Sequence, residues 1–327
     1  MAPRHPEILE AHRLEANRAS PVTSQQLIQF VKQGAEAQGS STRERSLLSV
    51  ENRPRPPVEV PTRDHHNLPM TSYHALVHLY QDVYSFCFLV AWDCKTVPGK
   101  LKQIDAGTGQ VFGVNDANDI YTLYGNTWTQ LPGKLKHVTV GPAGVWGTAP
   151  NDQIYRLVGG QWSQVKGILK QIDAGGDQFV AGVNRYYHIF CLGKSGTVPI
   201  KGPDSRVPWV RVPGGLNYYS CGPISCWGVT GRDQIFIRKK VTPTSCAGPV
   251  NWEHVGGSLS MIEVSAEGHV YGVNSNGNVY IRNGVTDSNP TGTGWTEVGL
   301  CFKAKHVSYD LGHLWVIKKD GSIMKCV

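Results

Sequence analysis

The sequence predicts an all-β protein, a six-bladed β-propeller of four-stranded blades, in residues 92–327. Three observations predict this fold. A short pattern recurs six times, each copy has the features of a β-hairpin, and a strand that opens with tryptophan follows five of the copies. The 37 glycines among 327 residues, of which 40% are hydrophobic, are typical of a turn-rich globular protein.

The repeat centres on a strand of the type Val-aromatic-Gly-Val. A second strand begins six residues beyond the glycine position, as at Asp119 after Gly113. Between the two strands stand Asn, Asp and Gly residues, which tolerate the dihedral angles of tight turns. Each copy therefore predicts a hairpin. The six copies begin at Val111, Val145, Val180, Cys226, Val270 and Leu314.

Two further strands complete each unit, and four strands describe a propeller blade. One precedes the hairpin, as in residues 101–106. The sixth unit stops at Val327 without a tryptophan strand, whereas Trp92 stands alone before the first unit. We therefore expect the strand at Trp92 to complete the last blade and close the ring, which would hide its strand edges. The tryptophan strands of the other units open at Trp128, Trp162, Trp209, Trp252 and Trp295.

Two sets of side chains recur at fixed strand positions. The aromatic residues of the central pattern, like the opening tryptophans, are expected to pack within the blades rather than to hold a ligand. The lysines alternate with apolar residues around the first strand and are expected on a solvated face, with contact to lipopolysaccharide phosphate as the alternative. The aromatic set is Phe112, Trp146, Trp227, Tyr271 and Trp315, and the lysines are Lys100, Lys102, Lys134, Lys136, Lys303 and Lys305.

The first ninety residues do not share this pattern. Residues 1–69 mix charged runs with prolines and can bury little apolar surface, so we expect a disordered extension or an artefact of gene prediction. Residues 70–91 begin at Met70 and contain a short apolar run that resembles a secretion signal cleaved near Ala91. A buried helix is the alternative. The expected organisation is thus an extension, a signal-like segment and a propeller over residues 92–327.

The cysteines indicate an oxidising compartment, because seven of the eight lie after Trp92. Zinc is disfavoured, since no Cys-x-x-Cys pair exists and no matched histidine pair follows. Closing the ring places Cys94 beside Cys326. We therefore expect a disulfide there, which in the chain-entropy model would contribute about 4 to 5 kcal/mol.

A second disulfide is expected within the fourth unit. Cys221 and Cys226 flank a turn in which cross-strand side chains approach within disulfide range. The alternative is that one of them pairs with Cys246. One of the seven cysteines would then be left free, unless Cys87 takes part.

The whole net charge of +7 belongs to the propeller segment. Before Trp92 there are 9 Lys+Arg and 9 Asp+Glu, and from Trp92 onward there are 23 and 16. Such a charge keeps a protein in solution, or favours anionic partners such as lipopolysaccharide, acidic glycans or phospholipid surfaces. Tight clustering is limited to residues 238–240, so nucleic acid is not expected as a partner. No run is long and apolar enough to predict a transmembrane segment.

These motifs resemble tectonin repeats. The resemblance rests on three motifs, namely the strand Gly-x-Leu-Lys-Gln-Ile-Asp-Ala-Gly, the Trp-Gly-Val hairpin and the strand Trp-x-x-Val-Pro-Gly. Over residues 92–327 the chain resembles the tectonin-repeat β-propeller lectins, and among them the fish-egg lectins, especially in residues 218–229, 259–264 and 304–315. The resemblance implies secretion into egg or body fluids, recognition of N-acetylglucosamine-type sugars and bacterial lipopolysaccharide, and a role in innate defence.

The hairpin turns are the predicted sugar sites, because side-chain amides and carboxylates bond pairs of sugar hydroxyls. For each residue the alternative is an ordinary turn-forming role. Several weak sites on one ring would raise avidity for a dense glycan. Arg185, Tyr186 and Tyr187 replace the Asn/Asp turn in the third unit, and Lys318 and Lys319 in the sixth, so fewer than six sites are expected. The candidates are Asn115, Asp116, Asn118, Asp119, Asn151, Asp152, Asn274, Asn276 and Asn278.

No motif for catalysis or nucleotide binding occurs, including the Gly-x-Ser-x-Gly elbow, the P-loop and His-Glu-x-x-His. We therefore expect neither an enzyme nor a cofactor, and leave calcium open. His306, Asp310 and His313 are assigned structural rather than metal-binding roles. The alternative function is a tectonin-type propeller that binds a protein or a phosphoinositide inside the cell. The sequence leaves open whether the ring forms a homodimer.

Overall fold

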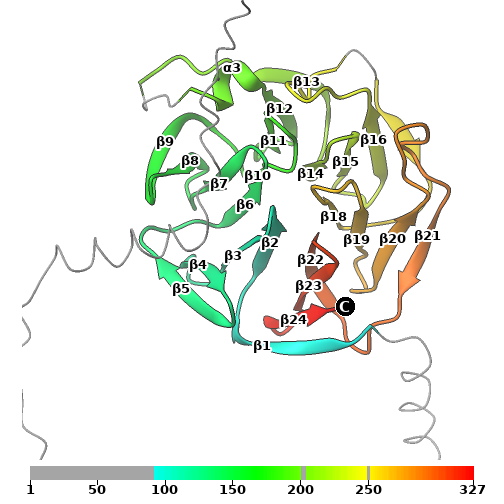
Figure 1. Ribbon diagram of the computed structural model, residues 1–327. Helices are drawn as coiled ribbons and strands as arrows, with labels where there is room; N and C mark the ends of the chain where they lie inside the picture. The colour runs from blue at the N-terminus through cyan, green and yellow to red at the C-terminus, as the bar shows by residue number, and fades with distance from the viewer. Residues whose placement is uncertain (1–91, 200–203, 249–250) are drawn as a thin grey trace, which may run out of the picture.

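A computed structural model describes residues 92–199, 204–248 and 251–327. Within these ranges six antiparallel four-stranded sheets stand around a central axis (Figure 1). The predicted six-bladed propeller is confirmed. The expectations for residues 1–69 and 70–91, among them Cys87 and the secretion signal, lie outside the described residues.

Blades 1 to 3 follow the predicted order, with the first strand at the axis and the fourth at the rim. A short helix, α3 (Lys194–Thr197), lies between the third and fourth strands of blade 3. Blade 1 contains β2 (Gln103–Gly107), β3 (Gln110–Val114), β4 (Ile120–Tyr124) and β5 (Thr127–Leu131). Blade 2 contains β6 (His137–Gly141), β7 (Gly144–Thr148), β8 (Gln153–Val158) and β9 (Gln161–Ile168). Blade 3 contains β10 (Gln171–Asp173), β11 (Val180–Val183), β12 (His188–Leu192) and β13 (Val210–Gly215).

Blades 4 and 5 repeat the same order, and blade 6 is completed from the other end of the described chain. Blade 4 contains β14 (Tyr218–Cys221), β15 (Ser225–Val229), β16 (Ile235–Lys239) and β17 (Glu253–Val255). Blade 5 contains β18 (Met261–Val264), β19 (Val270–Val273), β20 (Val279–Asn283) and β21 (Gly294–Val298). Blade 6 contains β22 (Ala304–Asp310), β23 (His313–Lys318), β24 (Ser322–Cys326) and β1 (Cys94–Lys100).

Ring closure takes place in blade 6, where β1 pairs with β24 in antiparallel register. Cys94 lies opposite Cys326 in this register, and the two form a disulfide with a Cα–Cα distance of 4.0 Å across 232 residues of sequence. The count of strands in the sequence was therefore sufficient to predict how the ring closes.

The other disulfides agree only in part with expectation. Cys221 and Cys226 face each other in the β14–β15 register and form a disulfide. The alternative pairing of Cys246 with either of them is wrong, because the loop after β16 brings Cys246 to β12, where it pairs with Cys191. The expectation of a free cysteine is also wrong, since Cys301 is disulfide-bonded and no cysteine in the described ranges is free.

Neighbouring innermost strands run in the same direction. Gln103 Nε2 donates to the Val138 carbonyl at 2.7 Å, and the Val138 amide donates to Gln103 Oε1 at 3.0 Å. Two residues further along both strands, the Val140 amide donates to Asp105 Oδ2 at 2.7 Å. All turns of one kind therefore lie at the same end of the ring.

We call the end with the turns between second and third strands the hairpin face; the chain also passes from blade to blade there. The opposite face holds the connections between the first and second strands and between the third and fourth strands of each blade. Those between the third and fourth strands are long over residues 193–209, 240–252 and 284–293. The hairpin-face turns comprise residues 115–119, 149–153, 184–188, 230–234, 274–278 and 318–322.

The aromatic side chains of the central pattern are buried, so their predicted packing role is confirmed. The opening tryptophans are only half-buried and lie between blades at the rim, where three of them donate a hydrogen bond to a backbone carbonyl of the preceding blade. They join neighbouring blades rather than fill a blade core. The bonds run from Trp209 to Lys166, from Trp252 to Pro213 and from Trp295 to Gly256, at 2.9, 2.7 and 2.9 Å.

Candidate functional site

One backbone geometry recurs in all six turns of the hairpin face. The fourth residue of each turn has a left-handed backbone, and its carbonyl accepts a hydrogen bond from an amide at the start of the next blade, as from Leu135 to Asn118 at 3.0 Å. The turn thus joins one blade to the next. The left-handed residues are Asn118, Asp152, Tyr187, Asp233, Gly277 and Gly321, with φ of 63°, 71°, 65°, 60°, 89° and 85°.

The richest predicted cluster, in blade 1, is drawn together by its own hydrogen bonds. The Asp119 amide donates to Asn115 Oδ1 at 2.8 Å, and Asn115 Nδ2 donates to Asp119 Oδ2 at 3.0 Å. Asn118 Oδ1 accepts from Lys102 Nζ at 2.5 Å. Asp116 stays exposed without such a bond, so it is the member of this cluster that presents a carboxylate to solvent.

The side chain of Asp119 also carries an ion pair. Lys134 Nζ lies 2.5 Å from Asp119 Oδ1. The hydrogen bonds from Lys134 and then Asn115 hold the pKa of Asp119 below its usual range. The carboxylate is therefore fully charged at neutral pH and already committed to a partner.

In blade 2 the predicted residue Asp152 is buried between two cations. Lys136 Nζ bonds one carboxylate oxygen, and Arg185 from the turn of blade 3 bonds the other at 2.6 Å. Burial would raise the pKa of Asp152, but the hydrogen bonds from Lys136 and Arg185 outweigh it and lower that pKa. Asp152 therefore links two blades, whereas its neighbour Asn151 is exposed and caps the amide of Gln153 at 3.2 Å.

The blade 5 turn follows the same plan. Asn274 Oδ1 accepts from the Asn278 amide at 2.9 Å, and Asn278 Oδ1 accepts from Lys303 Nζ. Asn276 is exposed at the tip. The structure therefore keeps the predicted residues of blades 1, 2 and 5 on separate turns of one face, and on each turn one of the predicted side chains is exposed to solvent.

Lysines at the start of the first strands were missed as parts of these turns. The expectation of a solvated face is wrong for Lys102 and Lys136, which are half-buried and bond Asn118 and Asp152. The signal was present in the sequence, because a Leu-Lys pair precedes the first strand of blades 1, 2 and 3 at the same position. The sequence does not show which turn residues these lysines bond, because strand and turn come together only in the folded blade.

A buried polar layer fills the central channel. Ser220 Oγ bonds Asp173 Oδ1 and Glu263 Oε1, both at 3.1 Å, and Ser308 Oγ bonds Asp105 Oδ1 at 2.9 Å. Burial raises the pKa of Asp105 to about 6. Burial and then the charge of Asp105 raise the pKa of Asp173 to about 8, and burial followed by both aspartates raises the pKa of Glu263.

At neutral pH Asp173 and Glu263 therefore favour their protonated forms, and the hydroxyl of Ser220 joins the two by hydrogen bonds. Next to this layer, Tyr218 Oη lies 3.0 Å from His137 Nε2 and 2.9 Å from His306 Nε2. In the part of the chain that the structure describes, no group of three or more His, Cys, Asp or Glu side chains could hold a metal ion. The structural role assigned to His306 stays a prediction.

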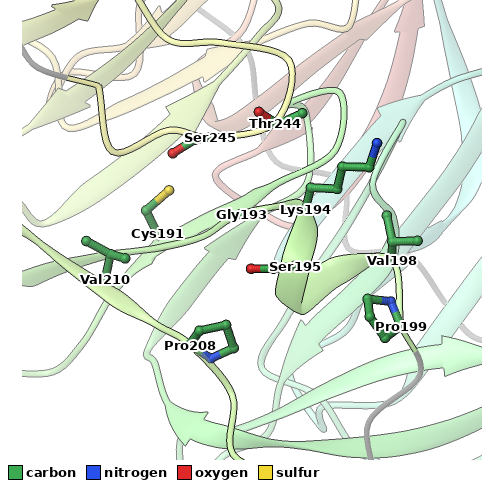
Figure 2. A pocket seen from close by; sticks show the side chains of 10 residues that line it. All are labelled: Cys191, Gly193, Lys194, Ser195, Val198, Pro199, Pro208, Val210, Thr244 and Ser245. Atoms are coloured by element: carbon green, nitrogen blue, oxygen red, sulfur yellow. The ribbon is translucent and has the colours of Figure 1, made fainter.

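The opposite face has a hollow of about 720 Å³ between blades 3 and 4, beside the Cys191–Cys246 disulfide (Figure 2). Val198, Pro199 and Val210 are among its apolar walls, and Lys194 carries its charge. None of the described residues that line it is aromatic or a carboxylate. None of the sugar-binding residues predicted from the sequence lines this hollow.

The sequence of the propeller matches a known family. The Tectonin domain matches residues 100–319. The chain therefore belongs to the tectonin family of β-propellers. Its sequence is 60% identical over 236 residues to fish-egg lectin from Cyprinus carpio, an overlap that covers 72% of this chain and 98% of that protein.

A solved structure with a similar fold is that of regucalcin, a calcium-binding protein from Agrobacterium tumefaciens. The TM-score is 0.50 and the sequence identity is 11%, and the alignment covers 72% of this chain and 94% of that chain. At this identity the likeness concerns the fold alone. Among the described residues, no helix has the length and apolar character needed to cross a membrane.

Proposed function

We propose that the chain is a secreted lectin that binds N-acetylglucosamine-type sugars and bacterial lipopolysaccharide through repeated sites on the hairpin face, in egg or innate defence. The observation that carries the proposal is the identity of 60% with carp fish-egg lectin across 98% of that protein. The proposed activity is therefore sugar binding rather than catalysis.

Two features support secretion and an anionic glycan. Three disulfides lie among the described residues, and disulfides persist in oxidising compartments. The net charge of +7 favours the phosphate groups of lipopolysaccharide. An intracellular propeller that binds a protein or phosphoinositide would keep its cysteines reduced.

Within each turn the predicted residues divide into two roles. Asp116, Asn151 and Asn276 project to solvent and are proposed to contact sugar hydroxyls. The others hold the turn through the hydrogen bonds described above. Because the turns stand on one rigid face, several weak contacts can act together on a dense microbial surface. The turn-holding residues are Asn115, Asn118, Asp119, Asp152, Asn274 and Asn278.

A glycan array and a lipopolysaccharide-binding assay on the purified full chain, oxidised and reduced, test the proposal. We expect selective retention of glycans that bear N-acetylglucosamine, and at least a tenfold loss of avidity when Asp116, Asn151 and Asn276 are all changed to Ala. The matched control changes Asp287, Asn126 and Gln161, exposed residues of the opposite face, and should bind as the parent does. A folded, oxidised protein that retains no glycan would instead support the protein-interaction propeller.

A further inference from the structure

The turn of blade 3 breaks the rule that the other five turns obey. At its left-handed position stands Tyr187, where the equivalent residues are asparagine, aspartate or glycine. Those three types tolerate this backbone region, whereas a bulky aromatic residue is strained there. The strain is fixed by the fold, because the Tyr187 carbonyl must accept the Leu216 amide at 3.0 Å to join blade 3 to blade 4.

Burial does not compensate for this strain. Tyr187 is 50% exposed, and its neighbour Tyr186 is 69% exposed. Two adjacent aromatic rings therefore face solvent at the tip of one turn. Strained residues without a packing role are concentrated at binding and catalytic sites, and exposed aromatic side chains provide the flat apolar surface on which a pyranose ring can lie.

Cations surround this aromatic pair. Lys170 Nζ lies 4.7 Å from the centre of the Tyr187 ring and donates to Asn217 Oδ1 at 2.6 Å. Arg185 is in the same turn and shares Asp152 with Lys136. Lys170, Arg185 and Lys136 thus carry three positive charges near the single negative charge of Asp152. The local excess of positive charge attracts a ligand that carries negative charge.

We propose that Tyr186, Tyr187 and Lys170 form a subsite for an acidic pyranose, a sugar that bears a carboxylate or a phosphate group. The apolar face of the sugar packs on the tyrosine rings while its acidic group binds the ammonium of Lys170. This inference rests on the proposed lectin function and names the sugar class for one blade. It reverses the expectation that the Arg-Tyr-Tyr departure weakens the third site.

Tyr187→Gly separates binding from folding, because glycine adopts the left-handed backbone without strain. We expect a melting temperature that is unchanged or higher, together with at least a tenfold loss of affinity for glucuronic acid and for glucose 6-phosphate by saturation-transfer NMR. Asp233→Gly makes the same change at the equivalent position of blade 4 and should leave the affinity for both acidic sugars unchanged.

Lys170→Gln tests the charge, since glutamine keeps a donor for Asn217. The parent should prefer both acidic sugars over glucose, and this variant should lose the preference while still binding glucose. The two acidic probes show whether a carboxylate or a phosphate is the better ligand. Equal binding of glucose by the parent, or unchanged affinity in Tyr187→Gly, would overturn the subsite.

The same samples applied to N-acetylglucosamine-agarose distinguish this inference from the lectin proposal. If the parent binds the resin but no acidic pyranose, the subsite is wrong and the lectin proposal stands. If the parent binds acidic pyranoses but not the resin, the subsite is supported and the N-acetylglucosamine assignment fails. If it binds neither, both are wrong.

Discussion

The two faces of the ring are held together by different interactions. On the hairpin face every blade donates the same backbone hydrogen bond to the preceding turn, and Lys–Asp or Lys–Asn contacts reinforce several of the turns. On the opposite face the connections vary in length, and three disulfides lie at this end of the ring. Two of them join paired strands, and the third joins β12 to the connection after β16. The difference follows from chain direction, because the chain enters each new blade on the hairpin face.

The turns of the hairpin face therefore share one backbone geometry, whereas the connections of the opposite face do not. The connection between the third and fourth strands of a blade differs in length from blade to blade, as residues 193–209 show beside residues 159–160. A turn that must meet the next blade cannot change its backbone. Tyr187 illustrates this limit, since its side chain departs from the pattern while its backbone does not.

The largest expected effect lies on the opposite face, at the closing disulfide. Replacing Cys94 and Cys326 by Ser should lower the free energy of unfolding by about 5 kcal/mol, because the bond closes a loop of 232 residues. Replacing Cys221 and Cys226 opens a loop with a separation of 5 residues and should cost about half as much. Denaturant unfolding measures both; equal losses would contradict the entropic reason for the difference.

The polar layer between the two faces should make stability fall as pH rises from 6.5 to 8. Asp173, with a pKa raised to about 8 from 3.8, and Glu263 keep protons in the folded state that the unfolded chain has already released. The unfolded state then binds fewer protons, so the free energy of unfolding decreases with pH, by up to about 2 kcal/mol for each such group over this range.

Below pH 6.5 the buried histidines act in the opposite direction. Burial lowers the pKa of His137 and lowers that of His306 to about 3, so the unfolded chain takes up protons that these rings in the folded protein do not. The window above pH 6.5 therefore isolates the carboxyls. Thermal unfolding of Asp173→Asn across this window should show a flatter pH dependence than the parent, and an identical slope would exclude Asp173 as its source.

A smaller effect is expected on the hairpin face. Asp152→Asn keeps the left-handed backbone but removes the charge that Lys136 and Arg185 share, and should lower the free energy of unfolding by about 1.5 kcal/mol. Arg185 is half exposed, so most of this loss comes from Lys136. Asp233→Asn, at the equivalent position without an ion pair among those the structure shows, should change stability by less than about 0.5 kcal/mol. Chemical unfolding of the two variants compares them directly.

The smallest effect concerns the rim, where the faces meet. Trp252→Phe removes the hydrogen bond to Pro213 between blades 3 and 4 and should cost about 1 kcal/mol. In Trp128 the buried indole N–H has no hydrogen-bond acceptor in the described structure, so Trp128→Phe should cost less. Melting temperatures of the two variants test this difference. A larger loss of stability in Trp128→Phe would show that ring packing, rather than the hydrogen bond, joins the blades.

The sequence predicted the fold more fully than the site. Strand alternation and turn residues are local, so the hairpins beginning at Val111 and Val270 could be recognised one at a time. The turn residues Asn115 and Asn274 could be found in the same way. The sequence did not show that their side-chain oxygens accept hydrogen bonds from backbone amides of the same turn. That depends on side-chain direction in the folded hairpin.

By itself the sequence determined the number of blades, the order of their strands and the closure of the ring through Cys94 and Cys326, because each follows from counting a short repeat along the chain. Tertiary structure alone decided that Cys246 meets Cys191, that Arg185 binds Asp152 and that three acids share the channel. These contacts join residues of different blades or loops, and their distances are set by how six sheets pack around one axis.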